Sequence, residues 1–302
     1  MEINLIELSA FLNDEEKAYQ LVEGLRWPNG PVCPREDCGS DRVYRLKVKG
    51  TSRKVLKCGE CRRQFTVMVG TIFEDSHIPL SKWVAAFYMM CSSKKGVSTH
   101  QLHRELGISY KSALFMTHRI RYAMSQPPLA DKLTGIVEVD ETYIGGLEKG
   151  KPGRPGRSSK KMPVVALIQR DTGESRSFHV PDVSSKSLKG LIRRNVDGMA
   201  HIMTDSLQSY KGLDEEFASH GTVDHSKEYV RGIIHVNFAE SFFSLLKRGI
   251  LGTFHHVSAQ HLPRYLDEFN FRWSNRTATD GERMVKAIKG AEGKRLTLRP
   301  SA

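Results

Sequence analysis

Long hydrophobic runs and abundant cysteines are both missing from this sequence. No apolar stretch among the 302 residues reaches the 18 or more residues of a membrane-spanning helix. The opening Met-Glu-Ile-Asn-Leu-Ile-Glu lacks the basic start of a secretion signal. The five cysteines, four of them in two close pairs, do not resemble the disulfide framework of a secreted domain. We therefore expect a protein of the reducing cytoplasm that has no membrane partner.

Acidic residues are scarce in two segments that are rich in lysine and arginine. The formal net charge is +12. Residues 42–63 carry nine Lys or Arg against Glu60 alone, and residues 147–163 carry six against Glu148 alone. Such an excess favours polyanionic partners such as nucleic acid, although a solvated charged face has the same composition. The length predicts two or three domains.

Four cysteines have the spacing of a zinc ribbon. Cys33 and Cys38 form one pair, nineteen residues follow, and Cys58 and Cys61 form the second. Two short pairs about twenty residues apart supply four thiolates to one tetrahedral zinc ion, with a hairpin between them. Four thiolates leave no open position for a substrate, so the expected role is structural. Two disulfides or unrelated thiols are the alternative.

The ribbon is expected within an N-terminal domain, residues 1–68, together with a helix over Glu15–Leu25 that Asn13 or Asp14 caps. The fifth cysteine, Cys91, is expected to be a small buried hydrophobe.

Residues 76–126 have the pattern of a helix-turn-helix, with the turn at Gly107. The helices expected here begin at Pro79 with Ser81 as cap, run from Ser98 through Leu106, and extend over Tyr110–Met124 with Ser109 as cap. The third helix would enter the major groove of DNA, and its exposed contact candidates are Lys111, Thr117, His118 and Arg121. A helical hairpin that binds nothing is the alternative.

Residues 134–280 predict an α/β domain with a mixed sheet. Strands are expected near Gly135, Met162, Ser175 and His201, and an extended run near Val223. Helices are expected up to Arg194 with Ser184 or Ser185 as cap, over Tyr210–Ala218, around Glu240 and over His261–Trp273. This order fits a ribonuclease H-like sheet flanked by helices, in which the first and fourth strands are neighbours.

Three acidic residues stand where such a fold would bring them together. Asp140 ends the first strand, Asp205 ends the fourth, and Glu240 lies on the late helix after 34 intervening residues. Carboxylates this close repel one another unless a cation neutralises them, which favours Mg²⁺ or Mn²⁺. Two such ions roughly 3.5–4 Å apart serve an in-line phosphoryl displacement. Lys247, seven residues after Glu240, would hold the DNA backbone near the metals.

Each acid also has a simpler interpretation. Asp205 would be a helix N-cap, Glu240 a solvated helix residue, and Asp140 one of several acids in a turn. Glu138 and Glu141 flank Asp140; by the two-residue period of a strand, Glu138 shares its face and Glu141 points away. The pattern leaves both interpretations open.

Five motifs match a known family. They are Val-Glu-Val-Asp-Glu-Thr-Tyr-Ile-Gly-Gly (137–146), Thr-Asp-Ser (204–206), His-Val-Asn-Phe-Ala-Glu-Ser-Phe-Phe-Ser-Leu-Leu-Lys-Arg-Gly (235–249), Phe-His-His-Val-Ser (254–258) and Tyr-Leu-Asp-Glu-Phe-Asn-Phe-Arg-Trp-Ser-Asn-Arg (265–276). Through them the chain, from about Trp27 to Arg276, resembles the DDE transposases of bacterial insertion sequences with an N-terminal zinc ribbon, relatives of the Merlin elements.

The resemblance implies an integrase-type catalytic core in which Asp140, Asp205 and Glu240 hold the metal. Some groups of the family are described with asparagine or histidine as the third residue, and Asn237 and His235 precede Glu240 here. Glu240 is the expected ligand because a carboxylate binds a divalent cation more strongly than a neutral amide does.

The reaction implied is cutting of double-stranded DNA at the element's terminal inverted repeats, with water as nucleophile. The freed 3′-hydroxyl then attacks target DNA. A homo-oligomer is expected because two element ends must be held together.

Two other functions would keep most of these features. One is a transposase-derived regulator that binds the repeats without cutting, and the other is a structure-specific nuclease. The basic loop at 150–161 would contact phosphates or be a plain flexible insertion. Residues 281–302 are expected to be a basic tail that starts with a surface helix.

Overall fold

The computed structural model describes residues 3–47, 54–125, 131–145, 161–224 and 226–297. They form two units: Met1–Ser125 with Thr277–Ala302, and Gln126–Arg276. The basic loop predicted at 150–161 lies, apart from Lys161, outside the described residues. Within the described residues, no helix combines the length and the apolar character that crossing a bilayer requires.

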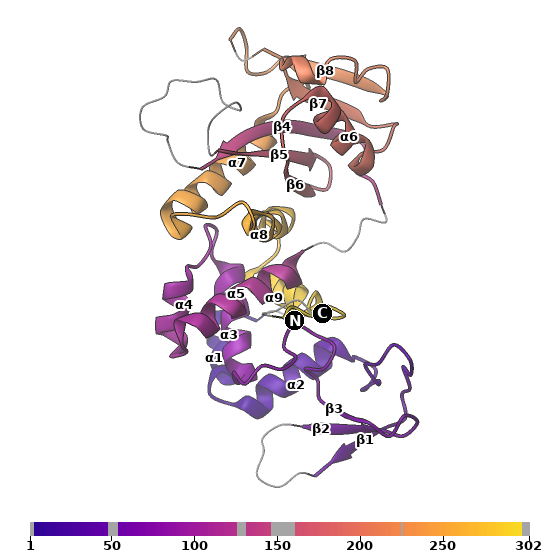
Figure 1. Ribbon diagram of the computed structural model, residues 1–302, viewed down its shortest axis with the longest axis vertical. Coiled ribbons are helices and arrows are strands. Elements are labelled where there is room, and N and C mark those ends of the chain that lie inside the picture. The colour runs from indigo at the N-terminus through magenta and orange to yellow at the C-terminus, as the bar shows by residue number, and fades with distance from the viewer. Residues whose placement is uncertain (1–2, 48–53, 126–130, 146–160, 225, 298–302) are drawn as a thin grey trace. The chain divides into compact units, whose positions relative to one another are not determined.

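The first unit combines packed helices with a small antiparallel sheet (Figure 1). Its helices are α1 (Leu5–Leu12), α2 (Glu15–Arg26), α3 (Leu80–Ser92), α4 (Thr99–Leu106), α5 (Tyr110–Met124) and α9 (Asp280–Lys289), and its strands, in sheet order, are β1 (Val43–Leu46), β2 (Val55–Cys58) and β3 (Gln64–Phe65).

Local capping signals predict the starts of α2, α4 and α5 correctly. The hydroxyls of Ser98 and Ser109 accept hydrogen bonds from the backbone N–H groups three residues on, at 3.2 and 3.1 Å, and the Asp14 carboxylate does the same for α2 at 3.1 Å. Gly107 ends α4 with a φ of 57°, a left-handed conformation that glycine adopts without strain. These elements follow from residues close together in the chain.

The start of α3 was predicted wrongly. Ser81 lies inside the helix, whose N-cap is Pro79 and has no capping side chain of its own. The Glu15 carboxylate at the beginning of α2 accepts from the backbone N–H groups of Leu80 and Ser81, at 2.7 and 3.0 Å. A side chain more than sixty residues away thus satisfies the free donors of this helix end.

Three of the four DNA contacts predicted on α5 are wrong. Thr117 and Arg121 have no exposed surface and His118 is 8% exposed, while Lys111 is exposed. Helix α5 packs against α3, α4 and α9, so its polar residues on several sides are enclosed. Direct readout of DNA by Thr117, His118 and Arg121 is therefore excluded in this arrangement.

The C-terminal helix α9 is part of the core of the first unit, whereas the sequence predicts a surface helix. It buries Met284, Ala287 and Ile288 and packs on α3. Gly281 lies against the start of the chain, where a Cβ would come within 2.3 Å of the Ile3 carbonyl oxygen. Only glycine permits this approach, so both ends of the chain belong to one packed unit.

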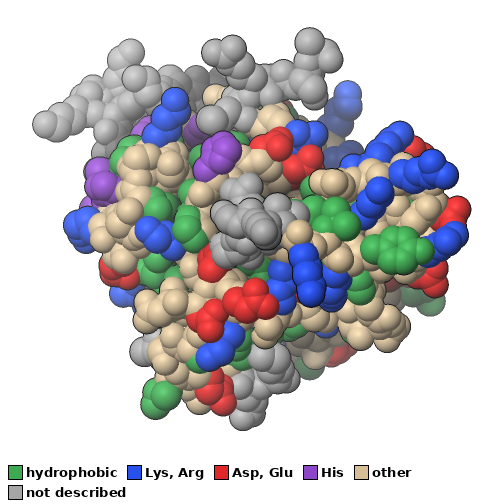
Figure 2. Space-filling view, turned by 90° about the horizontal axis from the view of Figure 1, so that it is seen from below, with side chains coloured by type: hydrophobic (Ala, Val, Ile, Leu, Met, Phe, Trp, Pro, Cys, Tyr) green, Lys and Arg blue, Asp and Glu red, His purple; other side chains and the backbone are tan. Residues whose placement is uncertain are grey.

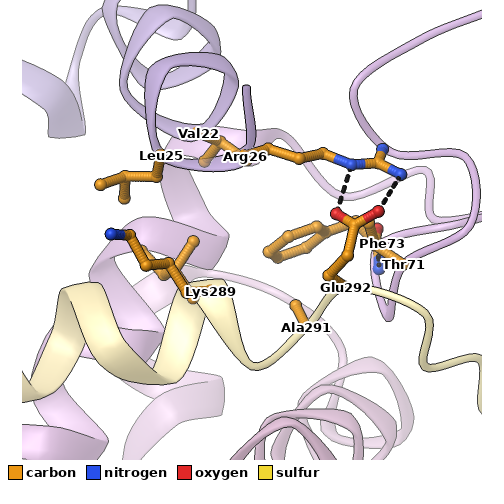
Figure 3. A pocket seen from close by; sticks show the side chains of 9 residues that line it. Val22, Leu25, Arg26, Thr71, Phe73, Lys289, Ala291 and Glu292 are labelled. Carbon is orange, nitrogen blue, oxygen red and sulfur yellow. Dashed lines mark hydrogen bonds and ion pairs between the residues drawn. The ribbon is translucent and has the colours of Figure 1, made fainter. Parts of the chain in front are cut away.

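An ion pair fastens the segment after α9 to α2 (Figure 3). The Arg26 guanidinium donates to the Glu292 carboxylate at 2.5 and 2.9 Å and to the Val67 carbonyl oxygen at 2.6 Å. The pair borders a cavity of about 270 Å³ that is otherwise lined mainly by apolar side chains, among them Leu25 and Phe73. The Glu292 carboxylate therefore compensates the charge of Arg26 at the border of this cavity.

Acidic neighbours pair with much of the basic hairpin at 42–63. On the face in view, Figure 2 shows Lys and Arg side chains beside Asp and Glu side chains. The pairs are Arg42–Glu60 at 3.4 Å, Arg63–Asp37 at 3.6 Å, Lys54–Glu16 at 2.6 Å, and Arg45–Glu23. Surface pairs of this kind are weak, yet they reduce the local cationic excess below what the sequence count indicates.

The second unit contains a five-stranded mixed sheet (Figure 1), where the sequence predicts a mixed sheet of four strands and an extended run near Val223. Its elements are β4 (Ile136–Ile144), β5 (Met162–Gln169), β6 (Ser175–His179), α6 (Ser185–Asn195), β7 (His201–Asp205), the 3₁₀ turn η1 (Gln208–Tyr210), β8 (Ser219–Val223), α7 (Asn237–Gly249), the π-helical turn η2 (Ile250–Phe254) and α8 (Leu262–Ser274).

The strand order is β6-β5-β4-β7-β8. The β6/β5 and β5/β4 pairs are antiparallel, and the β4/β7 and β7/β8 pairs are parallel. The first and fourth strands of the domain, β4 and β7, are therefore neighbours, and the ribonuclease H-like mixed sheet is confirmed.

Helices cover both faces of this sheet. One core joins Ile144 and Val164 to α7 and α8, through side chains that include Phe242 and Phe269. The other joins alternate residues of β4 and β5 to α6 and η1. Alternation along β4 thus sends even-numbered residues toward α7 and odd-numbered residues toward α6 and η1.

The helix predicted over Tyr210–Ala218 does not form. Only Gln208–Tyr210 make a 3₁₀ turn. Gly212 has a φ of 79°, which is incompatible with a right-handed helix, and the Tyr210 ring is fully buried against the α6 face.

Candidate functional site

The four paired cysteines meet in the first unit. Their sulfur atoms all lie within 4.8 Å of one another, with Cys33–Cys61 at 3.8 Å and Cys38–Cys58 at 3.6 Å. A tetrahedral zinc ion with bonds of about 2.3 Å requires sulfurs roughly 3.8 Å apart. None of the five cysteines is in a disulfide, and Cys91 is buried as predicted. The donor set fits structural zinc.

Asp140 and Asp205 come together where β4 and β7 separate. The parallel pairing of the two strands runs as far as Glu138 opposite Met203. Two residues further along each strand are Asp140 and Asp205, on the same face of the sheet. Beyond β7 the chain turns away, with the Asp205 carboxylate accepting from the Leu207 N–H at 3.0 Å. The strand ends therefore bring the two carboxylates together.

Glu141 joins these two acids, although the sequence predicts that it points away. Oxygens of Asp140, Glu141 and Asp205 all lie within 4.8 Å of one another. Alternation does place Glu141 on the α6 side, where the buried Tyr210 hydroxyl donates to its carboxylate at 2.6 Å. Strand β7 ends at Asp205, so no later residue of β7 lies between Asp205 and Glu141. The period of two predicted the face correctly and the isolation of Glu141 wrongly.

Helix α7 presents the other predicted residues on one exposed side. Asn237, Glu240 and Lys247 are exposed, while Phe242 and Leu246 are fully buried. Glu240 lies outside the 4.8 Å group of carboxylates. Its charge still acts on Asp140, since it is one of the groups that raise the pKa of that carboxyl. The structure thus brings Asp140 and Asp205 into contact and leaves Glu240 at the edge of the cluster.

The acids of this cluster alter one another's pKa values. Burial, followed by the charges of Glu141, Asp205 and Glu240, raises the pKa of Asp140 to about 8. Burial also raises the pKa of Glu141 to about 7, with a further contribution from Asp205. Among the described residues, no Lys or Arg forms an ion pair with Asp140, Glu141 or Asp205. Three oxygen-donor carboxylates with no cationic partner among the described residues fit a hard divalent ion.

These raised pKa values predict how stability depends on pH. Between about pH 5 and 8, folded protein without added Mg²⁺ or Mn²⁺ binds more protons at Asp140 and Glu141 than the unfolded chain does. The free energy of unfolding contributed by these groups therefore falls as pH rises through this range. Asp140→Asn should flatten the fall, because asparagine does not titrate. Thermal unfolding of both proteins, with zinc retained, measures the difference; parallel curves would contradict the assignment.

The stabilisation that added Mn²⁺ provides should increase with pH, whereas the stability of the metal-free protein should decrease. Its ligands must be deprotonated, so the rise in Tm that the metal produces should grow between pH 6 and 9. The same pair of proteins tests this, since Asp140→Asn should remove most of the metal-dependent rise.

Comparisons with known proteins agree with this architecture. A family model of the ISXO2-like transposase domain matches residues 132–274, and one of the transposase zinc-ribbon domain matches residues 13–64. A Halobacterium salinarum protein, described as an uncharacterized protein in transposable element ISH50, is 32% identical over 273 residues. These residues are 85% of this chain and 90% of that protein.

Two further similarities cover less of the chain or are more distant. An uncharacterized transposase-like protein of Haemophilus influenzae is 31% identical over 96 residues, 32% of this chain and 77% of that protein. Among solved structures, a pre-cleavage Mos1 transpososome aligns with 71% of this chain and 80% of that chain, at 14% sequence identity and a TM-score of 0.26. With a ribbon and a catalytic-type domain both matched, and a relative of 32% identity along most of its length, the chain belongs to the ISXO2-like DDE transposases with an N-terminal zinc ribbon.

Proposed function

We propose that this transposase binds the terminal inverted repeats of an insertion sequence, cleaves a DNA strand there and transfers the freed end to target DNA. The observation that carries the proposal is the group of Asp140, Glu141 and Asp205 at the separating ends of β4 and β7, with no described cationic partner. A transposase-derived regulator that only binds DNA would have no need of such a group.

Different side chains of the catalytic domain bind the metal and the DNA in this proposal. Asp140 and Asp205 hold Mg²⁺ or Mn²⁺ from the sheet, and Glu240 approaches from the exposed side of α7 as the third ligand. When bound, the metal supplies charge stabilisation for the entering and leaving oxygens of a phosphodiester displacement. Glu141, hydrogen-bonded to Tyr210, adds a fourth carboxylate at the same strand end. Lys247, on the same side of α7, holds a DNA phosphate.

The first unit supplies DNA affinity in this proposal. The zinc ribbon (1–68) and the helix-turn-helix (76–126) position the repeats before the catalytic domain (134–280). Within the described residues, Lys47, Lys57 and Arg62 of the ribbon pair with no acidic side chain, and Lys111 is exposed at the start of α5. Phosphate contacts from such residues give affinity that falls with salt. The active assembly is a homo-oligomer on double-stranded DNA in the cytoplasm.

A cleavage assay tests the function and the choice of third ligand. Purified protein is incubated with Mn²⁺ and labelled DNA that carries the element's end repeats. We expect a nick at the repeat end, absent with Asp205→Asn or Glu240→Gln and retained with Glu215→Gln, an exposed carboxylate outside the cluster. Repeat binding with no cleavage under any metal condition would favour the regulator. Loss of cleavage in Asn237→Ala, with Glu240→Gln fully active, would make Asn237 the third residue.

A further inference from the structure

Glu138 has no exposed surface, and both of its carboxylate oxygens are engaged. One oxygen accepts from Arg170 Nε at 2.6 Å and lies 3.1 Å from His235 Nδ1. The other accepts from the backbone N–H groups of Phe238 and Ala239, at 2.8 and 3.1 Å. A buried carboxylate with these partners is fully satisfied, so its charge is held in place.

The N-terminus of α7 has no cap of its own. Its N-cap residue, Val236, has an apolar side chain and forms no capping hydrogen bond. Phe238 and Ala239 are the second and third residues of the helix, whose N–H groups have no partner inside it. The Glu138 carboxylate satisfies both donors from β4 and places a negative charge at the positive end of the helix.

Arg170 extends this anchor to the residues just before α7. Its Nη1 donates to the Ile233 carbonyl oxygen at 2.7 Å, and its Nη2 donates to the His235 carbonyl oxygen at 2.8 Å. Nη2 also lies 2.9 Å from His235 Nδ1. One guanidinium thus joins the Glu138 carboxylate to the segment that leads into the helix.

Glu138 also lies two residues before Asp140, on the same face of β4. At about 3.3 Å per residue, roughly 7 Å of one strand separates the helix anchor from the acid of the metal cluster. Glu138 accepts hydrogen bonds from the backbone of residues 238 and 239. The two candidates for the third ligand, Asn237 and Glu240, are the residues directly before and after this pair. A single side chain therefore links the position of both candidates to that of Asp140.

We propose that Glu138 is a positioning residue, which fixes α7 in register with β4 and so sets where the third ligand stands relative to Asp140. This inference rests on the proposed function for its catalytic meaning. Apolar packing of Phe242 and Leu246 holds α7 against the sheet but is non-directional. Directional hydrogen bonds to the first turn are what set the height and rotation of the helix end.

The test compares Glu138→Gln with a matched control, Glu268→Gln. Glu268 is also a fully buried glutamate paired with an arginine, Arg272, but both residues lie on α8. In Glu138→Gln an amide nitrogen replaces one acceptor and faces either Arg170 or the helix N–H groups. We expect Mn²⁺ binding, measured by calorimetry, to weaken by about 10- to 100-fold in Glu138→Gln and to stay near wild type in Glu268→Gln.

Cleavage kinetics should show the same difference between Glu138→Gln and Glu268→Gln. For Glu138→Gln we expect kcat to fall and the Mn²⁺ concentration for half-maximal rate to rise, with KM for DNA unchanged. Arg170→Lys, which keeps the charge but cannot bridge Glu138 to two carbonyl groups, should have a smaller effect in the same direction. If Glu138→Gln does not fold, Arg170→Lys carries the test. Metal binding and kcat equal to wild type in the folded variants would overturn the proposal.

Amide hydrogen exchange separates this inference from the proposed function. In protein without added Mn²⁺, the N–H groups of Phe238 and Ala239 should exchange faster in Glu138→Gln than in wild type, and no faster in Glu268→Gln. This readout needs no catalysis. Unchanged exchange would show that Glu138 does not hold the helix end, even if the wild-type enzyme cuts DNA. If exchange is faster in Glu138→Gln but the wild-type protein never cuts DNA, Glu138 anchors the helix and the anchor has no catalytic meaning.

Discussion

Replacing Asp140 by asparagine is expected to slow DNA strand cleavage by about 10³-fold or more while the protein still folds and binds DNA. The carboxylate lies within 4.8 Å of Glu141 and Asp205, so its loss removes a shared ligand from the cluster. A bound divalent ion stabilises the transition state by several kcal/mol, and each 1.36 kcal/mol corresponds to a tenfold change in rate. Single-turnover cleavage and a gel-shift assay on the same DNA measure the two effects separately.

The asparagine variant should also be at least as stable as wild type above pH 8 without added Mn²⁺. It removes a half-buried carboxyl group whose pKa is raised to about 8 by partial burial and by three neighbouring acids. A folded Asp140→Asn protein with wild-type cleavage would show that this acid is not a metal ligand. Loss of cleavage together with loss of folding would instead assign Asp140 a structural role.

Removing zinc, by chelation or by Cys58→Ser, is expected to unfold the ribbon and abolish repeat binding. Cys58 has no exposed surface and ends β2, so the ligand and the small sheet depend on each other. Structural zinc contributes about 10–16 kcal/mol of apparent binding free energy in zinc-finger peptides at pH 7. The Trp27 ring packs edge-on against Phe65 at 6.0 Å, so its fluorescence should shift to longer wavelength as the ribbon opens.

Zinc removal has two controls, which are the zinc content of the protein and the integrity of the second unit. Intact protein should contain one zinc per chain by elemental analysis, and none after chelation. The second unit has no described cysteine and should keep its fold, which limited proteolysis can follow. Zinc-free protein with unchanged fluorescence and unchanged DNA affinity would contradict a structural ribbon.

Local sequence signals predict those elements whose determinants are also local. Ser98 and Ser109 cap α4 and α5, and Ser184 caps α6, because a hydroxyl three residues before a free N–H is sufficient. The order of strands and helices likewise predicts that β4 and β7 are neighbours, which brings Asp140 and Asp205 together. The cysteine spacing alone predicts the four-sulfur cluster.

The features that the sequence does not predict depend on contacts between segments far apart in the chain. No pattern near Leu80 shows that Glu15 caps α3, and no periodicity shows that Arg121 is fully buried. Glu141 joins the acids because β7 ends beside β4, and Glu138 caps α7 because a loop returns the helix to that strand. One signal was available: Glu138 lies between Val137 and Val139 at the apolar start of β4, and a carboxylate buried there requires a partner.

The most direct test of the account is anomalous diffraction from crystals of the protein soaked in Mn²⁺, recorded at the manganese edge. The account predicts a peak within about 2.0–2.3 Å of carboxylate oxygens of both Asp140 and Asp205, with Glu240 or Glu141 alongside. A separate zinc peak should lie among Cys33, Cys38, Cys58 and Cys61. Manganese bound elsewhere, or bound nowhere at concentrations that support cleavage, would contradict the metal-dependent mechanism.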